Sequence, residues 1–127
     1  MAGCSGEIMK ISFEYNKTAN TINALCPKVL TTEAFRNYFK DITLKKSDIN
    51  KAYEVVDFTN VEKFASTYQE LYDTMPLLKT LAKEKTVVKT TFKVRNPYQY
   101  GMARMLCSIF SFAGANCSVD YQNGKPD

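Results

Sequence analysis

The sequence has no histidine and only four cysteines among its 127 residues. Without histidine, no Ser-His-Asp or Cys-His catalytic arrangement can form, and a zinc site loses its usual nitrogen ligand. The cysteines are Cys4, Cys26, Cys107 and Cys117, and no two of them are spaced as Cys-x-x-Cys. We therefore expect no metal and no other cofactor. Three of the four cysteines fall on apolar faces of predicted elements, which favours buried core thiols over a disulfide framework.

Long apolar runs are also missing. No stretch approaches the roughly 20 apolar residues that a membrane-spanning helix needs. The first residues have neither the basic start nor the apolar region of a signal peptide. Ala2, Gly3 and Cys4 look like the end of a lipoprotein cleavage site, but no apolar segment precedes them. We expect a cytoplasmic protein without a membrane span.

A strong charge of one sign is absent too. The chain has 17 basic and 13 acidic residues, a formal net charge of +4, and the two signs alternate along most of it. This distribution is typical of an ordinary solvated surface, whereas nucleic-acid binders concentrate basic residues on one face. One local basic excess remains: Lys79, Lys83, Lys85, Lys89, Lys93 and Arg95. Nucleic-acid binding through it is the third-ranked hypothesis, and we expect no nucleic-acid partner.

The residues that are present predict one globular domain. A hydrophobic content of 45% and a charged content of 24% are ordinary for a folded protein. A chain of this length can bury about two thirds of its unfolded surface in a single core. We expect one domain over residues 1–127, with flexible ends at 1–6 and 122–127.

Apolar periodicity predicts the elements. Strands are indicated over 7–16, 21–26, 51–56, 86–94 and 116–121, with the run at Val55 and Val56 as the central strand. A first helix begins at Thr31 or Thr32, and a second follows Ser66 or Thr67. The second helix carries an apolar stripe formed by Phe64, Tyr68, Leu71, Tyr72 and Met75. It breaks at Pro76, because proline removes a backbone hydrogen bond. The third helix runs from Pro97 to about Ala113, with Asn96 as its cap and Gly114 as its stop.

This order, β-β-α-β-α-β-α-β, predicts an α/β fold with a mixed five-stranded sheet and right-handed crossovers. A parallel strand that is buried on both faces is apolar throughout. Because three of the predicted strands instead alternate apolar and polar residues, we expect the helices mainly on one face of the sheet. The other face is then open and carries Lys89 and Lys93.

Residues 53–61 (Tyr-Glu-Val-Val-Asp-Phe-Thr-Asn-Val), followed by Phe-Ala-Ser-Thr at 64–67, resemble the strand and helix entry of STAS domains. Residues 100–105 are similar to the third helix of the group that includes the sporulation anti-sigma-factor antagonists (SpoIIAA-like). The resemblance, with its matching element order, covers most of the chain. It implies a cytoplasmic, non-enzymatic interaction domain in which a serine or threonine at this helix entry is often phosphorylated. That position corresponds to Ser66 or Thr67, although Ala65 and Tyr68 replace the aspartate and glycine of the family pattern. Simple helix capping by the two hydroxyls is the alternative.

Physical reasoning points to the same edge of the sheet. Ligands favour the carboxyl ends of parallel strands, where helix N-termini and loop N–H groups gather. The residues expected on or near this edge are Asp57, Thr59, Asn60, Ser66, Thr67, Tyr68, Arg95, Asn96, Tyr98, Gln99 and Arg104. Arg95 at the start of the third helix is either part of an anion site or a structural residue that fixes the loop.

No enzyme is indicated. Asp57 has no second carboxylate at a readable spacing, and there is neither a Gly-rich phosphate loop nor a nucleophile beside a base. The leading hypothesis is a regulatory or scaffolding domain that binds a protein partner through residues 59–68 or the open sheet face, with Ser66 or Thr67 as the candidate switch. The competing hypothesis is a carrier or sensor of a small apolar or lipid-like ligand, held by Tyr68, Tyr72, Met75, Tyr98, Tyr100 and Met102. A homodimer contact at this edge is left open.

Overall fold

The structure is a computed structural model that describes residues 10–45, 48–84 and 86–122. Its main sheet has five strands in the order β1-β2-β4-β6-β7, in which β1 is antiparallel to β2 and all other neighbours are parallel. The bounds of these strands are β1 Ser12–Asn16, β2 Thr21–Leu25, β4 Ala52–Asp57, β6 Val87–Val94 and β7 Cys117–Tyr121. The mixed five-stranded sheet predicted from the sequence is confirmed.

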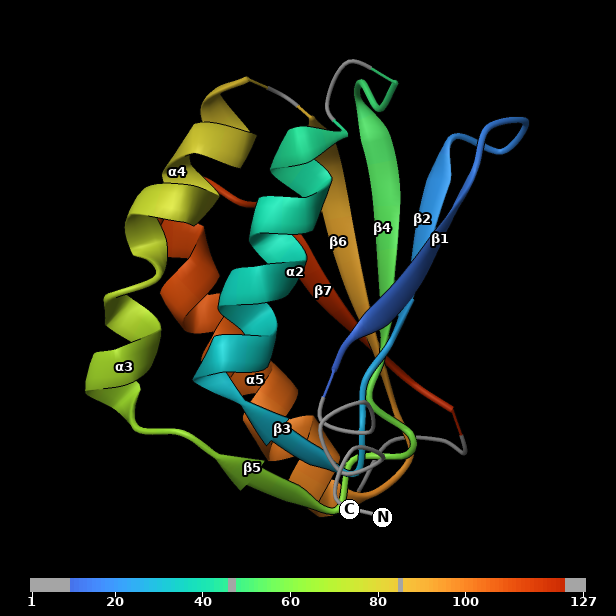
Figure 1. The fold of residues 1–127 in the computed structure, drawn as a ribbon. Coiled ribbons are helices and arrows are strands. Elements are labelled where there is room, and N and C mark those ends of the chain that lie inside the picture. The colour runs from blue at the N-terminus through green and yellow to red at the C-terminus, as the bar shows by residue number, and fades with distance from the viewer. Residues whose placement is uncertain (1–9, 46–47, 85, 123–127) are drawn as a thin grey trace, which may run out of the picture.

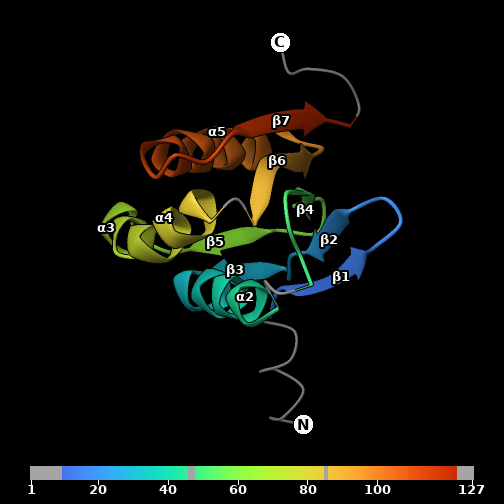
Figure 2. The same cartoon turned by 90° about the horizontal axis from the view of Figure 1, so that it is seen from above.

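The helices cover one face of this sheet (Figures 1 and 2). They are α2 (Thr32–Leu44), α3 (Tyr68–Tyr72), α4 (Met75–Lys83) and α5 (Pro97–Phe112). None of the helices in the described part of the chain is long and apolar enough to cross a membrane. The opposite face of the sheet carries exposed side chains such as Tyr53 and Lys89, so the one-sided arrangement is confirmed as well.

Local sequence signals set the helix ends. Thr31 caps α2 by accepting the Ala34 N–H at 3.1 Å, and Asn96 caps α5 by accepting the Gln99 N–H at 2.9 Å. Pro76 lies in the first turn of α4, so the predicted break separates α3 from α4. Gly114 follows α5 with a φ of 91°, a conformation that favours glycine.

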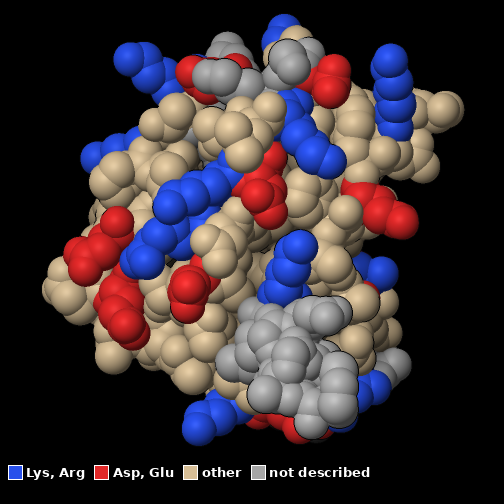
Figure 3. All heavy atoms as spheres, viewed as in Figure 1, with Lys and Arg blue, Asp and Glu red and all other residues tan. Residues whose placement is uncertain are grey.

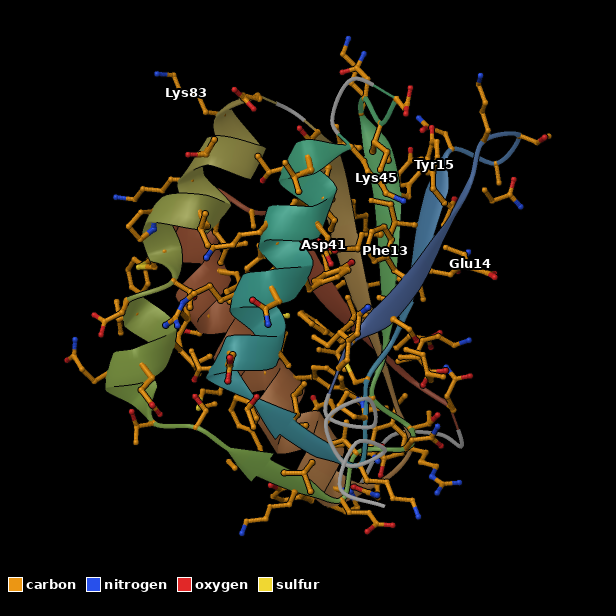
Figure 4. The ribbon with its side chains drawn as sticks, in the orientation of Figure 1. Phe13, Glu14, Tyr15, Asp41, Lys45 and Lys83 are labelled. Atoms are coloured by element: carbon orange, nitrogen blue, oxygen red, sulfur yellow. The ribbon has the colours of Figure 1, made fainter. Side chains whose placement is uncertain are left out.

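Alternation along β1 shows how the core is closed. Phe13 and Tyr15 point toward α2, whereas Glu14 points to the other side (Figure 4). The Lys45 ammonium lies 5.5 Å from the centre of the Phe13 ring. Deeper in the core, aromatic rings from α2, β6 and α5 pack in edge and tilted contacts; they are Phe35, Phe39, Phe92 and Phe110. One apolar core therefore joins the sheet to the helices.

Two short strands were missing from the prediction. β3 (Val29–Thr31) pairs in parallel with β5 (Lys63–Ala65) and forms a separate two-stranded sheet. Phe64 therefore lies in a strand, and its placement in the second helix was wrong. The reason is that Glu62 and Lys63 donate their N–H groups to the Lys28 carbonyl, which holds this segment extended against β3.

A β-bulge shifts the pairing register between β4 and β6. The pairing of β4 with β6 shifts between Ala52 and Tyr53, so that Ala52 lies opposite Val87 while Tyr53 lies opposite Lys89. Val87 consequently packs against the core and Val88 is exposed, whereas a regular alternation along residues 86–94 predicts the opposite sides for these two valines.

The chain ends and the cysteines need smaller corrections. The expected flexible ends lie outside the described residues, except Gln122, whose N–H donates to the Val94 carbonyl at 2.8 Å. Cys26 is buried, as expected. Cys107 and Cys117 are free thiols that pack against the core, as expected, but they are half-buried and so less buried than predicted.

Candidate functional site

The candidate site lies where β4 and β6 end, beside the start of α5. The two strand exits are joined, because the Phe58 N–H donates to the Lys93 carbonyl at 2.9 Å. The Asp57 carboxylate accepts two hydrogen bonds from Thr59, from the N–H at 2.8 Å and from the hydroxyl at 2.6 Å. Asp57 is therefore a turn residue that bends the chain out of β4.

Gln99 fixes the next part of the loop. Its side-chain amide donates to the Thr59 carbonyl at 3.2 Å and to the Val61 carbonyl at 3.0 Å, and its amide oxygen accepts the Arg95 N–H at 2.9 Å. The residue is only 1% exposed. One buried side chain thus ties loop 58–62 and the turn at Arg95 to the first turn of α5.

Around this anchor the surface is hollowed. A recess of about 550 Å³, which we call the edge hollow, is lined by Lys28, Thr59, Asn60, Val61, Glu62, Arg95, Asn96, Pro97, Tyr98 and Gln99. The side chains of Lys28, Asn60 and Arg95 are exposed. Tyr98 is half exposed, and its hydroxyl accepts the Phe64 N–H at 2.7 Å. The edge hollow is therefore an open, polar recess with two cations and one carboxylate in its lining.

Most of the residues expected at this edge are brought together there. Thr59, Asn60, Arg95, Asn96 and Tyr98 line the edge hollow, and Asp57 supports it from the end of β4. Arg104 does not join them. Its guanidinium donates to the Tyr100 hydroxyl at 2.8 Å, and it lines a different recess, between α5 and β7.

The candidate switch residues lie beyond β5, at the entry to α3. Thr67 caps α3 in a capping box: its hydroxyl accepts the Glu70 N–H at 3.1 Å, and the Glu70 carboxylate accepts the Thr67 N–H at 2.8 Å. Ser66 is half-buried and its hydroxyl is hydrogen-bonded to that of Thr32, in the first turn of α2. Tyr68 is half exposed and lies beside Tyr72, with 5.0 Å between the ring centres. Helix capping accounts for Thr67, and Ser66 has a separate structural contact.

The aromatic residues proposed to hold an apolar ligand are dispersed. Tyr68 and Tyr72 pack on each other at α3, Tyr100 packs on Tyr121 of β7 at 5.6 Å between ring centres, and Met102 is buried in the core. The structure therefore does not assemble one apolar pocket from this set.

Sequence reasoning missed a buried carboxyl group, that of Glu54 on β4. It accepts hydrogen bonds from the hydroxyls of Tyr38 and Thr90, the latter at 2.6 Å. Burial raises the pKa of Glu54, and the hydrogen bonds from Thr90 and Tyr38 partly oppose that rise. Burial, then the charge of Glu54, raises the pKa of Tyr38. The signal was the two-residue period of β4, which places Glu54 on the same face as Ala52 and Val56.

A cavity of about 30 Å³ adjoins Glu54 and is otherwise lined mainly by apolar side chains, including Phe39 and Leu78. This volume is enough for about one water molecule. It is too small for a lipid-like ligand. The described residues also contain no cluster of three or more His, Cys, Asp or Glu side chains that could hold a metal ion.

Basic and acidic residues are mixed on one face of the molecule. On the face viewed in Figure 3, lysine and arginine side chains are interspersed with aspartate and glutamate. Lys83 ends α4 at the top of the view in Figure 4, far from the edge hollow, whereas Lys89 and Lys93 lie on β6. Lys85 lies outside the described residues. The local basic excess is thus divided between the helix layer and the sheet.

Comparison with known proteins gives one informative result. No protein-family profile matches the chain, and the comparison with curated proteins also gave no match. A crystal structure of an uncharacterised protein of the DUF3478 family from Shewanella loihica PV-4, described as having a SpoIIAA-like fold, superposes with a TM-score of 0.54. The match has 13% sequence identity and covers 89% of this chain and 86% of the other. At this identity the likeness concerns the fold alone: the chain has a SpoIIAA-like α/β fold, as its resemblance to STAS domains implied.

Proposed function

We propose that this protein is a non-enzymatic regulatory or scaffolding domain that binds a protein partner at the edge hollow. The observation that carries the proposal is the combination of an open polar recess with a rim fixed by Gln99. A preformed recess lowers the entropy cost of binding, because its loops are already ordered. Lys28 and Arg95 favour a partner segment that carries a carboxylate.

The lining chemistry supports binding rather than catalysis. Asp57 is engaged by Thr59 through two hydrogen bonds. Glu62 is the carboxylate that the lining itself contributes, and it is exposed. The lining holds no cysteine or serine, and its hydroxyls, those of Thr59 and Tyr98, are both hydrogen-bonded. The Thr59 hydroxyl is engaged in the turn contact with Asp57, which favours a structural role for both residues.

Of the two candidate switch residues, Ser66 is the better one. A phosphate on Ser66 would break the contact with Thr32 and lie near the first turn of α2, where the helix dipole favours negative charge. A phosphate on Thr67 would disrupt the capping box and lie against the Glu70 carboxylate. We propose that modification of Ser66 alters partner binding through the β5 segment that joins Ser66 to the edge hollow.

The test uses charge reversal at the edge hollow with a matched control. Arg95→Glu should weaken capture of a specific partner from the native cells at least about tenfold, because it places a carboxylate in the proposed contact. Lys83→Glu makes the same charge change at the far end of α4 and should bind as the wild type does. Equal capture by both variants, with unchanged circular dichroism spectra, would contradict the proposal. Ser66→Asp should change capture more than Thr67→Ala does, and the opposite order would remove the Ser66 switch.

A further inference from the structure

Two thiols meet between α5 and β7. Cys107 lies in the third turn of α5 and Cys117 is the first residue of β7, and both side chains pack against the core where α5 meets β7. Both are half-buried, and both line a recess of about 440 Å³ together with Tyr100, Arg104, Asp120 and Tyr121. The recess therefore opens to solvent beside both cysteines.

The neighbours of this pair make the two thiols unequal. The hydrogen bond from Cys117 lowers the pKa of Cys107, the Arg104 guanidinium lowers it further, and burial opposes both effects. The same hydrogen bond raises the pKa of Cys117, followed by burial and by the charges of Cys107 and Glu54. Arg104, which precedes Cys107 by one turn of α5 and lines the same recess, favours a thiolate at Cys107. Thiolates, not thiols, attack peroxides and disulfides.

Arg104 is held where its charge can lower the pKa of Cys107. Its guanidinium lies 5.6 Å from the centre of the Tyr100 ring and donates to the Tyr100 hydroxyl. Tyr100 in turn packs on Tyr121 of β7, with 5.6 Å between ring centres. The cation is therefore fixed over the gap between α5 and β7, beside Cys107. Asp120 is the exposed carboxylate of the same recess.

We propose that Cys107 and Cys117 form a reversible redox pair, which a peroxide converts to an intramolecular disulfide. In the first step, the Cys107 thiolate attacks one oxygen of hydrogen peroxide and breaks the O–O bond, which gives a sulfenic acid and releases hydroxide. In the second step, the Cys117 sulfur attacks the Cys107 sulfur, the S–O bond breaks and water leaves. Overall the two thiols lose two protons and two electrons, and one peroxide takes them up to become two molecules of water.

The disulfide would join α5 to the strand at the edge of the sheet. At present β7 is held by pairing with β6 and by contacts with α5, such as that of Tyr121 with Tyr100. A covalent link would restrict opening of this edge. Cys26 provides an internal contrast, because it is 1% exposed and burial, with the charges of Asp57 and Glu54, raises its pKa.

The test exposes the folded, reduced protein, carrying Cys4→Ser, to a few equivalents of hydrogen peroxide. Free thiols are then alkylated in denaturant, and intact and peptide masses are measured. We expect a product lighter by two hydrogen atoms, a crosslinked peptide pair containing Cys107 and Cys117, and a single alkylated cysteine, Cys26. Dithiothreitol should restore both thiols. Cys26→Ser is the matched control and should form the same disulfide at the same rate.

Single variants separate the two steps. Cys117→Ser should stop at the Cys107 sulfenic acid, which dimedone labels, and Cys107→Ser should slow peroxide consumption at least about tenfold. Three results would overturn the proposal: a crosslink that contains Cys26, two fully alkylated thiols at Cys107 and Cys117 after peroxide, or no dimedone adduct in Cys117→Ser. If a serine variant fails to fold, the rate of Cys107 alkylation in the native wild-type protein decides. It should exceed that of Cys26 at least about tenfold, and equal rates would also overturn the proposal.

Discussion

Replacing Gln99 by alanine should release the loops that line the edge hollow from the first turn of α5. The side chain makes three hydrogen bonds to backbone groups, of Thr59, Val61 and Arg95. Alanine removes all three and leaves the Val61 carbonyl, which is buried, without this partner. The variant should therefore lose stability and, at the same time, order in loop 58–62.

The expected size of the loss follows from the bond count. A hydrogen bond contributes about 1 kcal/mol net, so removing three should lower the free energy of unfolding by about 3 kcal/mol. Urea m-values of small proteins lie between about 1 and 3 kcal/mol/M, which converts this loss into a midpoint lower by about 1 to 3 M. Urea titration followed by circular dichroism measures the midpoint. Hydrogen exchange at the Arg95 amide reports the local opening.

Gln69 supplies the matched control. It is exposed on α3, and its amide donates only to the Asp73 carboxylate, at 3.1 Å. Gln69→Ala should change the free energy of unfolding by less than about 0.5 kcal/mol. If Gln99→Ala costs no more than Gln69→Ala, the reasoning that one buried amide holds the site together is refuted.

Three further substitutions test other features. Glu54→Gln should gain stability relative to the wild type as the pH rises from about 5 to about 8. Burial raises the pKa of the Glu54 carboxyl in the folded protein above its ordinary value of 4.5, so the protonated carboxyl stabilises the folded wild type at low pH. The wild type loses this contribution as the pH rises through the folded-state pKa, whereas the glutamine variant has no such carboxyl to ionise. Urea titrations across this range would contradict the reasoning if the difference between the two proteins stayed constant. Thr67→Ala removes the capping box of a five-residue helix and should cost about 1 kcal/mol with faster amide exchange in α3, whereas unchanged exchange would show that the cap is dispensable. Gly114→Ala should lower the free energy of unfolding by about 1 kcal/mol, measured by a thermal melt, because the φ of Gly114 is 91°. Space is not the reason, since the added Cβ would meet Ala82 at an ordinary 3.8 Å. An unchanged stability would mean that the backbone relaxes there.

The fold was predictable where the periodic signal was long. The alternation in β1 and β6 identified these strands, a threonine cap located the start of α2, and the Asn96-Pro97 pair located the start of α5. β3 and β5 span three residues each, which is too short for a period to be read. Their stability comes from pairing between segments that are distant in the sequence, and single-sequence patterns do not contain that information.

The candidate site was predictable for the same topological reason. Residues at the ends of β4 and β6 lie together because neighbouring parallel strands end at one edge of the sheet. What the sequence did not reveal was the direction of individual side chains. Arg104 binds Tyr100 and lines the recess between α5 and β7 instead of the edge hollow. The proximity of Cys107 and Cys117 depends on how the turn at Gly114 returns the chain to β7.

The pairing pattern of the main sheet also bears on how the chain folds. The β1–β2 hairpin is the local pairing of this sheet, whereas the parallel pairings join segments as distant as Thr21 with Tyr53 and Thr90 with Cys117. Each distant pairing requires closure of a long loop before its contacts stabilise it. The hairpin is therefore the segment that can form earliest. The parallel strands join the sheet after it, and folding at the intermediate rate of mixed α/β domains is expected.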